Sequence, residues 1–282
     1  IVGTFMAGFY LIPFFGNFNL MILLGIVLIF LAIFVYNKVL KLNKWHYLII
    51  LFSVIFFFIV LIFSRMIWQP EGLVVDVDSS YSRIMIVDKK EKDSDRMIRT
   101  WQTDRHATQS AMYLDDPDEL VHDYTKYYRL ADYFDHKLEN TLMIGGAAYS
   151  YPKEFLKRFP ESTMTVVEID PVATELAKEY FYLEESDRLN IFHEDARYFL
   201  EQSEECYDAI YLDAFLTAIA VPYQLTTKET AQRFYDLLED DGVVLLNLIS
   251  AIDGKKGRFL QAEYKTYLSI FPYVYILPVY DN

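Results

Sequence analysis

The chain has 282 residues, is 53% hydrophobic and carries a formal net charge of −14, yet residues 1–64 contain no Asp or Glu, so residues 65–282 carry a net charge of −17. Such an acidic segment disfavours binding to nucleic acid or to an anionic membrane surface; it suits a cationic small substrate such as a polyamine, or serves solubility alone. The single cysteine, Cys206, excludes an internal disulfide and a cysteine-based metal cluster, and the five His lack metal-ligand spacing, so we expect no metal.

Two uncharged, mostly apolar runs lie near the N-terminus, at residues 18–36 and 47–63. Each is close to the roughly 20 residues that a helix needs to cross a bilayer, so we expect residues 1–66 to form transmembrane helices. We also expect these helices to be the end of a longer multi-pass segment, because the chain begins without Met. A signal peptide is the alternative, but a second span would not follow it.

Short runs of alternating hydrophobicity follow from about residue 71 to residue 103, and they predict a small antiparallel sheet. This sheet would form a small β-domain over residues 67–115. A helix is predicted next in "DPDELVHDYTKYYRLADYF", where apolar residues recur at helical spacing. Asp116 or Asp118 could cap its start.

From Thr141 the pattern changes to alternating strands and helices, which predicts an α/β fold with a doubly wound parallel sheet. The predicted strands are "TLMIG", "TMTVVEID", "LNIFHED", "YDAIYLDA" and "GVVLLNLIS", and the helices are "YPKEFLKRF", "PVATELAKEYF", "ARYFLEQS" and "TKETAQRFYDLLED". Asp170 before Pro171 is a good N-cap, and Asp241-Gly242 should mark the turn into the fifth strand. A helix over residues 258–270 and a strand "YVYILPV" should complete the chain.

Candidate site residues lie at the carboxyl ends of the predicted strands, where doubly wound sheets bind ligands. Gly145-Gly146 would let a ligand approach the backbone, and Glu168, about twenty residues further on, could accept the ribose hydroxyls. Asp195 could pair with an adenine amino group, and Asp213 could face the reacting atoms. The structural alternatives are a tight turn for the glycines, helix caps for Glu168 and Asp195, and a backbone hydrogen bond for Asp213. Their order favours a nucleoside site, and the lack of GxGxxG disfavours a dinucleotide site.

The series "GG", "VVEIDP", "HEDAR.FL", "YDAIYLDAF" and "P.QLTT.E", in this order, resembles the spermidine synthase family of aminopropyltransferases over roughly residues 75–280. The resemblance implies a class I methyltransferase-like, Rossmann-like fold behind a small N-terminal β-domain. Residues 116–282 would then be the adenosyl-nucleoside-binding catalytic domain, lacking a C-terminal seventh strand. The apolar front resembles a subgroup fused to a multi-pass membrane segment.

The resemblance implies a role for each candidate residue. Glu168 would hold the ribose, and Asp195 with Ala196 the adenine. Asp213 matches the catalytic Asp, which orients or deprotonates the attacking amine. The implied reaction moves an aminopropyl group from decarboxylated S-adenosylmethionine to a polyamine-type acceptor, and a homodimer is common in the family. The residues that would bind the cofactor are Gln109, Gly145, Gly146, Glu168, Asp195 and Ala196.

Three departures from the family pattern fall on the amine-handling side. Ala148 stands where the typical loop GGGDGG has an acid, Leu216 stands at the second acid of D-x-x-D, and Ser82 stands where a Gln usually follows the Tyr. We therefore expect an adenosyl group in the loop but a pocket that does not suit putrescine. Tyr149 or Phe215 could supply a cation–π contact in place of an acid, unless these rings are core residues.

Two other functions remain open, because fold alone does not choose among them. One is an S-adenosylmethionine-dependent methyltransferase, which uses the carboxylated cofactor. The other is a catalytically inactive, membrane-tethered sensor of an adenosyl nucleoside. A cation or free backbone N–H groups near residues 147–150 would favour the methyltransferase, since they could bind the methionyl carboxylate, whereas an aminopropyl amine would need acids there. The loop has no Lys or Arg before Lys153 and no acid before Glu154, so its charges do not choose between the two.

Two signals conflict over the location of the acidic domain. Three Lys between the apolar runs favour a cytoplasmic loop, which would send that domain outside. The adenosyl cofactor is made in the cytosol, and further upstream spans could override the Lys signal. We expect a multi-pass protein of the cell membrane with a cytosolic soluble domain, the lipid bilayer as a partner, and no nucleic-acid partner.

Overall fold

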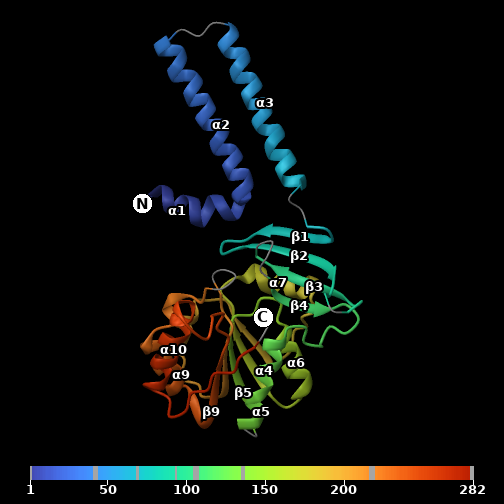
Figure 1. Ribbon diagram of the computed structural model, residues 1–282, viewed down its shortest axis with the longest axis vertical. Helices are drawn as coiled ribbons and strands as arrows, with labels where there is room; N and C mark the ends of the chain where they lie inside the picture. The colour runs from blue at the N-terminus through green and yellow to red at the C-terminus, as the bar shows by residue number, and fades with distance from the viewer. Residues whose placement is uncertain are drawn as a thin grey trace. The chain divides into compact units, whose positions relative to one another are not determined.

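The computed structural model describes residues 2–40, 44–67, 70–92, 94–103, 108–134, 137–215 and 220–279. The chain divides into two compact units, Ile1–Arg83 and Ile84–Asn282 (Figure 1). The predicted domain limits, 1–66, 67–115 and 116–282, remain predictions.

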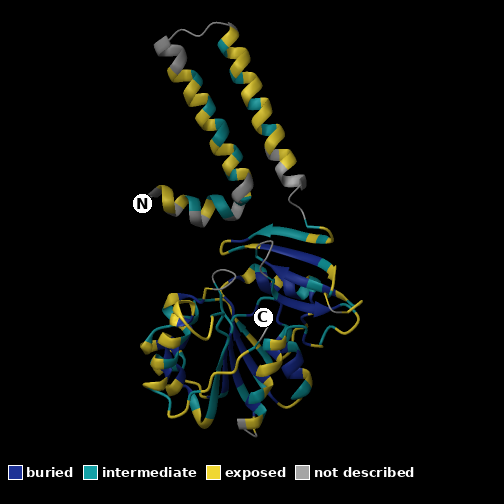
Figure 2. Cartoon of the chain, in the orientation of Figure 1, coloured by how far each residue is buried: buried dark blue, intermediate teal, exposed yellow. Residues whose placement is uncertain are grey.

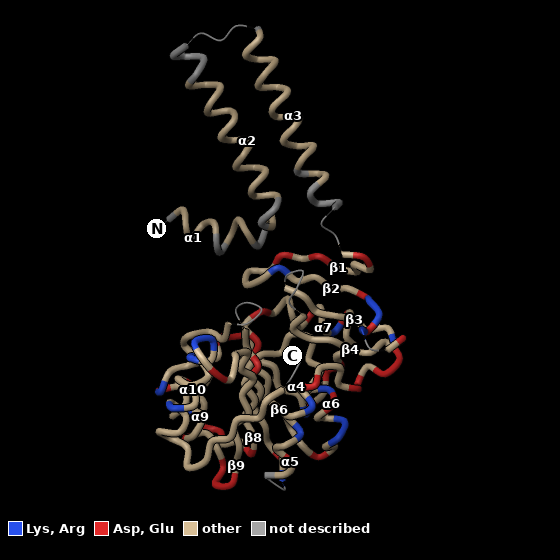
Figure 3. The backbone as a smooth tube through the Cα atoms, in the orientation of Figure 1, with Lys and Arg blue, Asp and Glu red and all other residues tan. Residues whose placement is uncertain are grey.

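The first unit is mainly helical. It contains α1 (Val2–Met6), a π-helical turn (Ala7–Leu11), α2 (Ile12–Leu40), α3 (Lys44–Ile67) and the strand β1 (Leu73–Asp78). Helix α2 is broken at Gly16, where φ is 72° and ψ is 156°, a conformation that glycine adopts without steric cost. Many of the described side chains of α2 and α3 are exposed (Figure 2), and few are charged (Figure 3).

The membrane-spanning helices predicted over residues 1–66 are not found. Among the residues that the structure describes, no helix has both the length and the apolar character required to cross a membrane. The predicted transmembrane front and the predicted multi-pass membrane location are therefore wrong, and nothing in the described residues supports the membrane-fused subgroup or the lipid bilayer as a partner.

The small antiparallel sheet is confirmed, with one strand more than predicted. Its strand order is β1-β2-β3-β4, with β2 at Arg83–Lys90, β3 at Met97–Gln102 and β4 at Thr108–Tyr113. The pairs β2–β3 and β3–β4 both run antiparallel. The additional strand, β4, carries the candidate Gln109.

The single helix predicted over residues 116–134 is replaced by short pieces. These are α4 (Asp123–Tyr127), a 3-10 turn (Tyr128–Leu130) and α5 (Ala131–Phe134). Helix α4 follows His122, whose side chain makes no capping hydrogen bond. Asp116 and Asp118 do not cap it: the Asp118 N–H donates to the Asp116 carboxylate at 3.3 Å, in a turn well before α4. The predicted caps are therefore wrong.

The second sheet is parallel and doubly wound, as predicted. Its strand order is β7-β6-β5-β8-β9, and all four neighbouring pairs are parallel. The strands are β5 (Asn140–Ile144), β6 (Thr163–Val167), β7 (Leu189–Phe192), β8 (Tyr207–Leu212) and β9 (Leu238–Leu246). The order reverses between β5 and β8, and this switch point is where doubly wound sheets bind ligands.

Helices cover both faces of the parallel sheet. They are α6 (Ser150–Arg158), α7 (Pro171–Tyr180), α8 (Ala196–Gln202), α9 (Lys228–Asp236) and α10 (Arg258–Leu268). Side chains alternate between the faces along each strand: Met143 and Tyr211 pack with residues of α5, α6 and α7, whereas Leu142 and Ile210 pack with residues of α8, α9 and α10. The central strands β6, β5 and β8 are accordingly mostly buried, whereas the edge strands β7 and β9 are partly exposed (Figure 2).

Two predictions near the C-terminus are wrong. Asp241-Gly242 does not precede the fifth strand but lies inside β9, whose pairing with β8 moves from Leu238 directly to Val243, so the intervening residues bulge. The segment "YVYILPV", residues 273–279, is not a strand, because it forms no ladder with any strand among the described residues.

Candidate functional site

The predicted site residues gather at one edge of the parallel sheet. Gly145 follows β5, Glu168 follows β6, Asp195 follows β7 and Asp213 follows β8. Because the strands are parallel and adjacent, their carboxyl ends meet at this edge. Gly145 and Asp213 flank the switch point itself.

Gly145 is pressed against the backbone of Asp213. Its φ is +95°, and a Cβ at this position would lie 2.3 Å from the Asp213 carbonyl oxygen. The Gly145 N–H donates to the Val167 carbonyl at 2.9 Å, and the Asp213 N–H donates to the Ile144 carbonyl at 2.9 Å. Both the backbone conformation and the lack of space require glycine here.

Glu168 binds the glycine loop and does not cap the following helix. Its Oε2 accepts hydrogen bonds from the N–H groups of Gly146 (2.8 Å) and Ala147 (3.1 Å), and its Oε1 accepts one from Asp170 (2.9 Å). Asp170 caps α7, as predicted, by accepting a hydrogen bond from the Val172 N–H. A carboxylate has about four acceptor sites, so three donors leave Glu168 room for a ribose hydroxyl.

Asp195 caps α8, which is the structural alternative to adenine binding. Its Oδ1 accepts hydrogen bonds from the N–H groups of Arg197 (2.8 Å) and Tyr198 (3.3 Å). Within the described part of the chain, Oδ2 accepts none, so it can still receive an amino group. Ala196 follows Asp195 directly, is the first residue of α8 and is half-buried.

Asp213 is half-buried and its carboxylate is surrounded by neutral polar groups. Asn247, which follows β9, donates its Nδ2 to Asp213 Oδ1 at 3.0 Å. The hydroxyls of Tyr124 and Tyr128 lie near the same carboxylate, and Tyr124 Oη also donates to the Gln109 carbonyl at 3.2 Å. Burial raises the pKa of Asp213 to about 6, against the opposing effect of Asn247 and the two phenols. A carboxylate that titrates near neutral pH is suited to accept a proton.

Three of these neighbours were not predicted as site residues: Tyr124, Tyr128 and Asn247. Burial first, and the charge of Asp213 second, raise the pKa of both phenols well above the usual value, so both keep their protons. Tyr128 Oη is buried and has no hydrogen-bond partner among the described residues. The two tyrosines are four positions apart and thus on one helical side, and Asn247 ends a predicted strand; these signals could have indicated them.

The residues that depart from the family pattern lie in different surroundings. Ala148 and Tyr149 are fully buried, so Tyr149 is a core residue and its ring is not free for a cation–π contact. Phe215 is partly buried and packs against the hydrophobic cluster on the α8–α10 face. Ser82 lies just before β2. Leu216 lies outside the described residues.

Lys153, on α6, is the one cation in residues 145–153. Its Nζ donates to the carbonyls of Pro117 (3.0 Å) and Phe181 (2.5 Å), and burial lowers its pKa to about 8. Its ammonium is therefore engaged by backbone carbonyls. This stretch, all of which the structure describes, offers no free cation for a carboxylate.

This chain is similar to several known proteins. Residues 121–282 match the model of the spermine/spermidine synthase domain. The polyamine aminopropyltransferase of Vibrio vulnificus is 32% identical over 169 residues, which cover 58% of this chain and 54% of the relative. The N-terminal histidine N-methyltransferase of Emericella nidulans is 35% identical over 138 residues, which cover 47% of this chain and 23% of the relative.

A solved structure, that of a probable spermidine synthase from Corynebacterium glutamicum, has a TM-score of 0.57 and 22% identity, and the match covers 72% of each chain. This likeness shows the fold: an antiparallel β-domain with a parallel Rossmann-like sheet. The chain spans about half the length of the Vibrio relative and less of the fungal one. The family model, in contrast, matches more than half of this chain, including Glu168, Asp195 and Asp213. The chain belongs to the spermine/spermidine synthase family.

Proposed function

We propose that this protein is an aminopropyltransferase that moves the aminopropyl group of decarboxylated S-adenosylmethionine to a polyamine-type amine. Its family uses this aminopropyl donor. The observation that carries the proposal is Asp213: a half-buried carboxylate at the switch point, with a pKa of about 6, a hydrogen bond from Asn247 and two neutral phenols nearby. Fold alone would not support a particular chemistry, whereas a carboxylate with these properties does.

The proposed reaction is a displacement at carbon. The acceptor nitrogen forms a bond to the aminopropyl carbon beside the sulfonium, the carbon–sulfur bond breaks, and methylthioadenosine leaves with the electron pair. Before it attacks, the acceptor ammonium gives up one proton so that its nitrogen has a free lone pair, and the new nitrogen centre then carries the positive charge that the sulfonium loses. Asp213 is ionised at pH 7 to 8 and accepts that proton, while Asn247 holds one of its oxygens in place.

The adenosyl group would be held along the same edge of the sheet. Glu168 has acceptor capacity left for a ribose hydroxyl, and the second oxygen of Asp195 is available for the adenine amino group. Gln109 would contact the donor from β4, where its main-chain carbonyl accepts a hydrogen bond from the Tyr124 hydroxyl. The proposed binding residues are Gln109, Gly145, Gly146, Glu168, Asp195 and Ala196, in a catalytic domain over residues 116–282.

The state of Lys153 favours the decarboxylated donor. The methionyl carboxylate of S-adenosylmethionine would need a counter-charge near the loop, and the ammonium of Lys153 is already bound to two carbonyls. Desolvating an unpaired carboxylate is costly. A donor without that group avoids the cost.

The acceptor pocket differs from one with two acids. The described polar neighbours of Asp213, namely Tyr124, Tyr128 and Asn247, are all neutral. One carboxylate can pair with one ammonium group. We therefore propose that the site binds only one ammonium group of the acceptor beside Asp213, so that a second ammonium group of a diamine finds no acidic partner there. Putrescine would then be a poor acceptor.

The test is mass spectrometry of the nucleoside product. The full chain is incubated with decarboxylated or carboxylated S-adenosylmethionine and with a monoamine, putrescine or spermidine, and Asp213→Asn serves as the inactive control. We expect methylthioadenosine that depends on both the amine and Asp213. S-adenosylhomocysteine from the carboxylated donor would instead favour a methyltransferase, to which the fungal relative points. Neither product, despite nucleoside binding, would leave only a protein that binds the nucleoside without turnover.

A further inference from the structure

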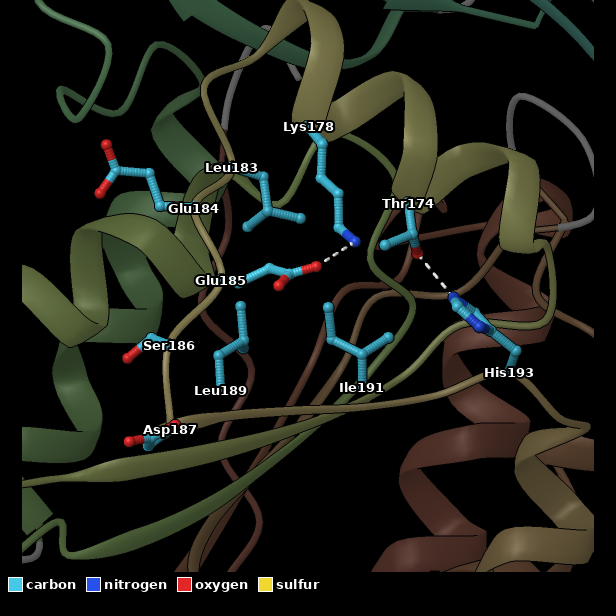
Figure 4. A pocket seen from close by; sticks show the side chains of 10 residues that line it. All are labelled: Thr174, Lys178, Leu183, Glu184, Glu185, Ser186, Asp187, Leu189, Ile191 and His193. Atoms are coloured by element: carbon cyan, nitrogen blue, oxygen red, sulfur yellow. Dashed lines mark hydrogen bonds and ion pairs between the residues drawn. The ribbon is translucent and has the colours of Figure 1, made fainter.

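A chain of hydrogen bonds runs from the glycine loop to the edge of the parallel sheet. Tyr149 Oη lies 2.7 Å from Thr174 Oγ1, and Thr174 Oγ1 lies 2.8 Å from His193 Nε2. Tyr149 and Thr174 are 0% and 1% exposed, whereas His193 is exposed and lines a cavity of about 640 Å³. Figure 4 shows Thr174 and His193 at one end of this cavity, joined by their hydrogen bond. The chain thus connects a buried loop residue to a side chain that solvent reaches.

The loop requires support, because parts of its backbone are strained. Ala147 and Tyr149 have φ values of 45° and 54°, in the left-handed region that favours glycine. The ring of Tyr149 lies directly against Gly146, where a Cβ would come within 2.6 Å of Tyr149 Cζ. The buried ring therefore fills the space beside Gly146, and its only described hydrogen bond is the one to Thr174.

The strained backbone carries the N–H groups that bind Glu168. The donors are Gly146 at 2.8 Å and Ala147 at 3.1 Å from Glu168 Oε2. Immediately after the loop, Ser150 Oγ donates to the Ala111 carbonyl at 3.0 Å and fixes the start of α6. The loop is thus held at its end by Ser150 and in its middle by the Tyr149 ring.

We propose that Thr174 and His193, acting through Tyr149, are positioning residues that keep the glycine loop and Glu168 in the arrangement that binds the nucleoside. The inference rests on the proposed function, because it takes Gly146 and Glu168 as nucleoside contacts. Thr174 fixes the Tyr149 hydroxyl, and His193 fixes the Thr174 hydroxyl. The ring then holds Gly146 and Ala147 against Glu168. It does so although Ala147 and Tyr149 both have left-handed φ values, which are unfavourable for residues other than glycine.

The variants are chosen to separate the hydroxyl from the shape of the side chain. Thr174→Val removes the hydroxyl and keeps the volume, whereas Thr174→Ser keeps the hydroxyl and is the matched control. Tyr149→Phe removes the same hydrogen bond from the other side. All are made in the full chain.

Hydrogen–deuterium exchange of the loop tests the bracing without any ligand. We expect the peptide with Gly146 and Ala147 to exchange about 3- to 10-fold faster in Thr174→Val and in Tyr149→Phe, the range for one lost hydrogen bond. Thr174→Ser should exchange like the wild type. A peptide from β8 reports global opening and should not change. Exchange that rises equally in β8, or that does not rise in the loop, would overturn the inference.

Titration calorimetry with methylthioadenosine as the probe tests the consequence for binding. We expect Thr174→Val to weaken binding about 3- to 10-fold, and Thr174→Ser to restore it. A wild type that does not bind the probe would overturn the proposed function, and with it the role of the Tyr149–Thr174–His193 hydrogen bonds in nucleoside binding. Wild-type binding that Thr174→Val leaves unchanged would overturn this inference alone.

Discussion

Replacing Asp213 with Asn should stabilise the protein at pH 8 while abolishing turnover. Burial raises the pKa of this carboxyl from 3.8 to about 6, because the folded protein disfavours its ionised form. Between these pH values the folded state keeps the proton that the unfolded chain releases, so stability is full below pH 3.8 and falls as pH rises to about 6. At about 1.4 kcal/mol per pKa unit, the loss above pH 6 is at most about 3 kcal/mol.

Asn carries no charge, so the variant escapes this loss, and its side-chain carbonyl can still accept the hydrogen bond from Asn247. Because Asp213 is partly exposed, we expect a gain in the free energy of unfolding of about 1–3 kcal/mol at pH 8. Guanidinium unfolding at pH 8 and pH 4 measures it, and the gain should vanish at pH 4. The control is Asp208→Asn, which should destabilise, because Asp208 accepts the N–H groups of Glu139 and Asn140, both at 2.7 Å. A variant at position 213 that is less stable at pH 8, or equally stabilised at both pH values, would refute the reasoning.

Three further substitutions test the loop and the start of α4. Gly145→Ala should lower the free energy of unfolding by more than about 2 kcal/mol in guanidinium titrations, since the new Cβ would meet the Asp213 carbonyl at 2.3 Å with φ at +95°; a variant of wild-type stability would contradict the contact. Glu168→Gln should weaken methylthioadenosine binding about tenfold in calorimetry, because a neutral amide accepts the loop N–H groups and a ribose hydroxyl less strongly. His122→Phe should reduce the acid sensitivity of the fold: burial lowers the pKa of His122 from 6.5 to about 4, so the wild type loses up to about 3 kcal/mol as pH falls through this window. Unfolding at pH 7.5 and 4.5 measures the difference, and equal losses in both proteins would exclude His122 as the cause.

The parallel sheet could be predicted from sequence because its local signals agree with its packing. Its central strands are buried on both faces, so each reads as an apolar run; Leu142 and Met143 simply point to opposite faces. Asp170 with Pro171, and Asp195, start helices where the structure starts them. Where burial on both faces requires apolar residues and helix caps separate the elements, a single sequence is sufficient to predict the strands and helices.

The segment from residue 108 to residue 134 was harder to predict, because contacts with the rest of its unit decide its structure. Strand β4 reads "TQSAMY" and has little apolar alternation, yet it pairs with β3. Tyr128 reads as an apolar position of a long helix, but the chain tightens into a 3-10 turn there. Its ring packs edge-on against Tyr151 and Tyr211, at 5.1 and 5.4 Å between centroids. Only these tertiary contacts bring its hydroxyl near Asp213.

The neutral groups around Asp213 explain how the proposed reaction could proceed with fewer acids than the family pattern has. A second carboxylate beside Asp213 would raise its pKa further through like-charge repulsion, whereas the Asn247 amide and the phenols favour the ionised form. With a pKa of about 6, Asp213 stays ionised at pH 7.5 and is still basic enough to take a proton. Leu216, in place of the second acid, should therefore remove attraction for a second ammonium and leave the proton transfer intact. The expected signature is a high KM for putrescine with a kcat close to that of the preferred amine; a normal KM with a low kcat would place the defect in the chemistry instead.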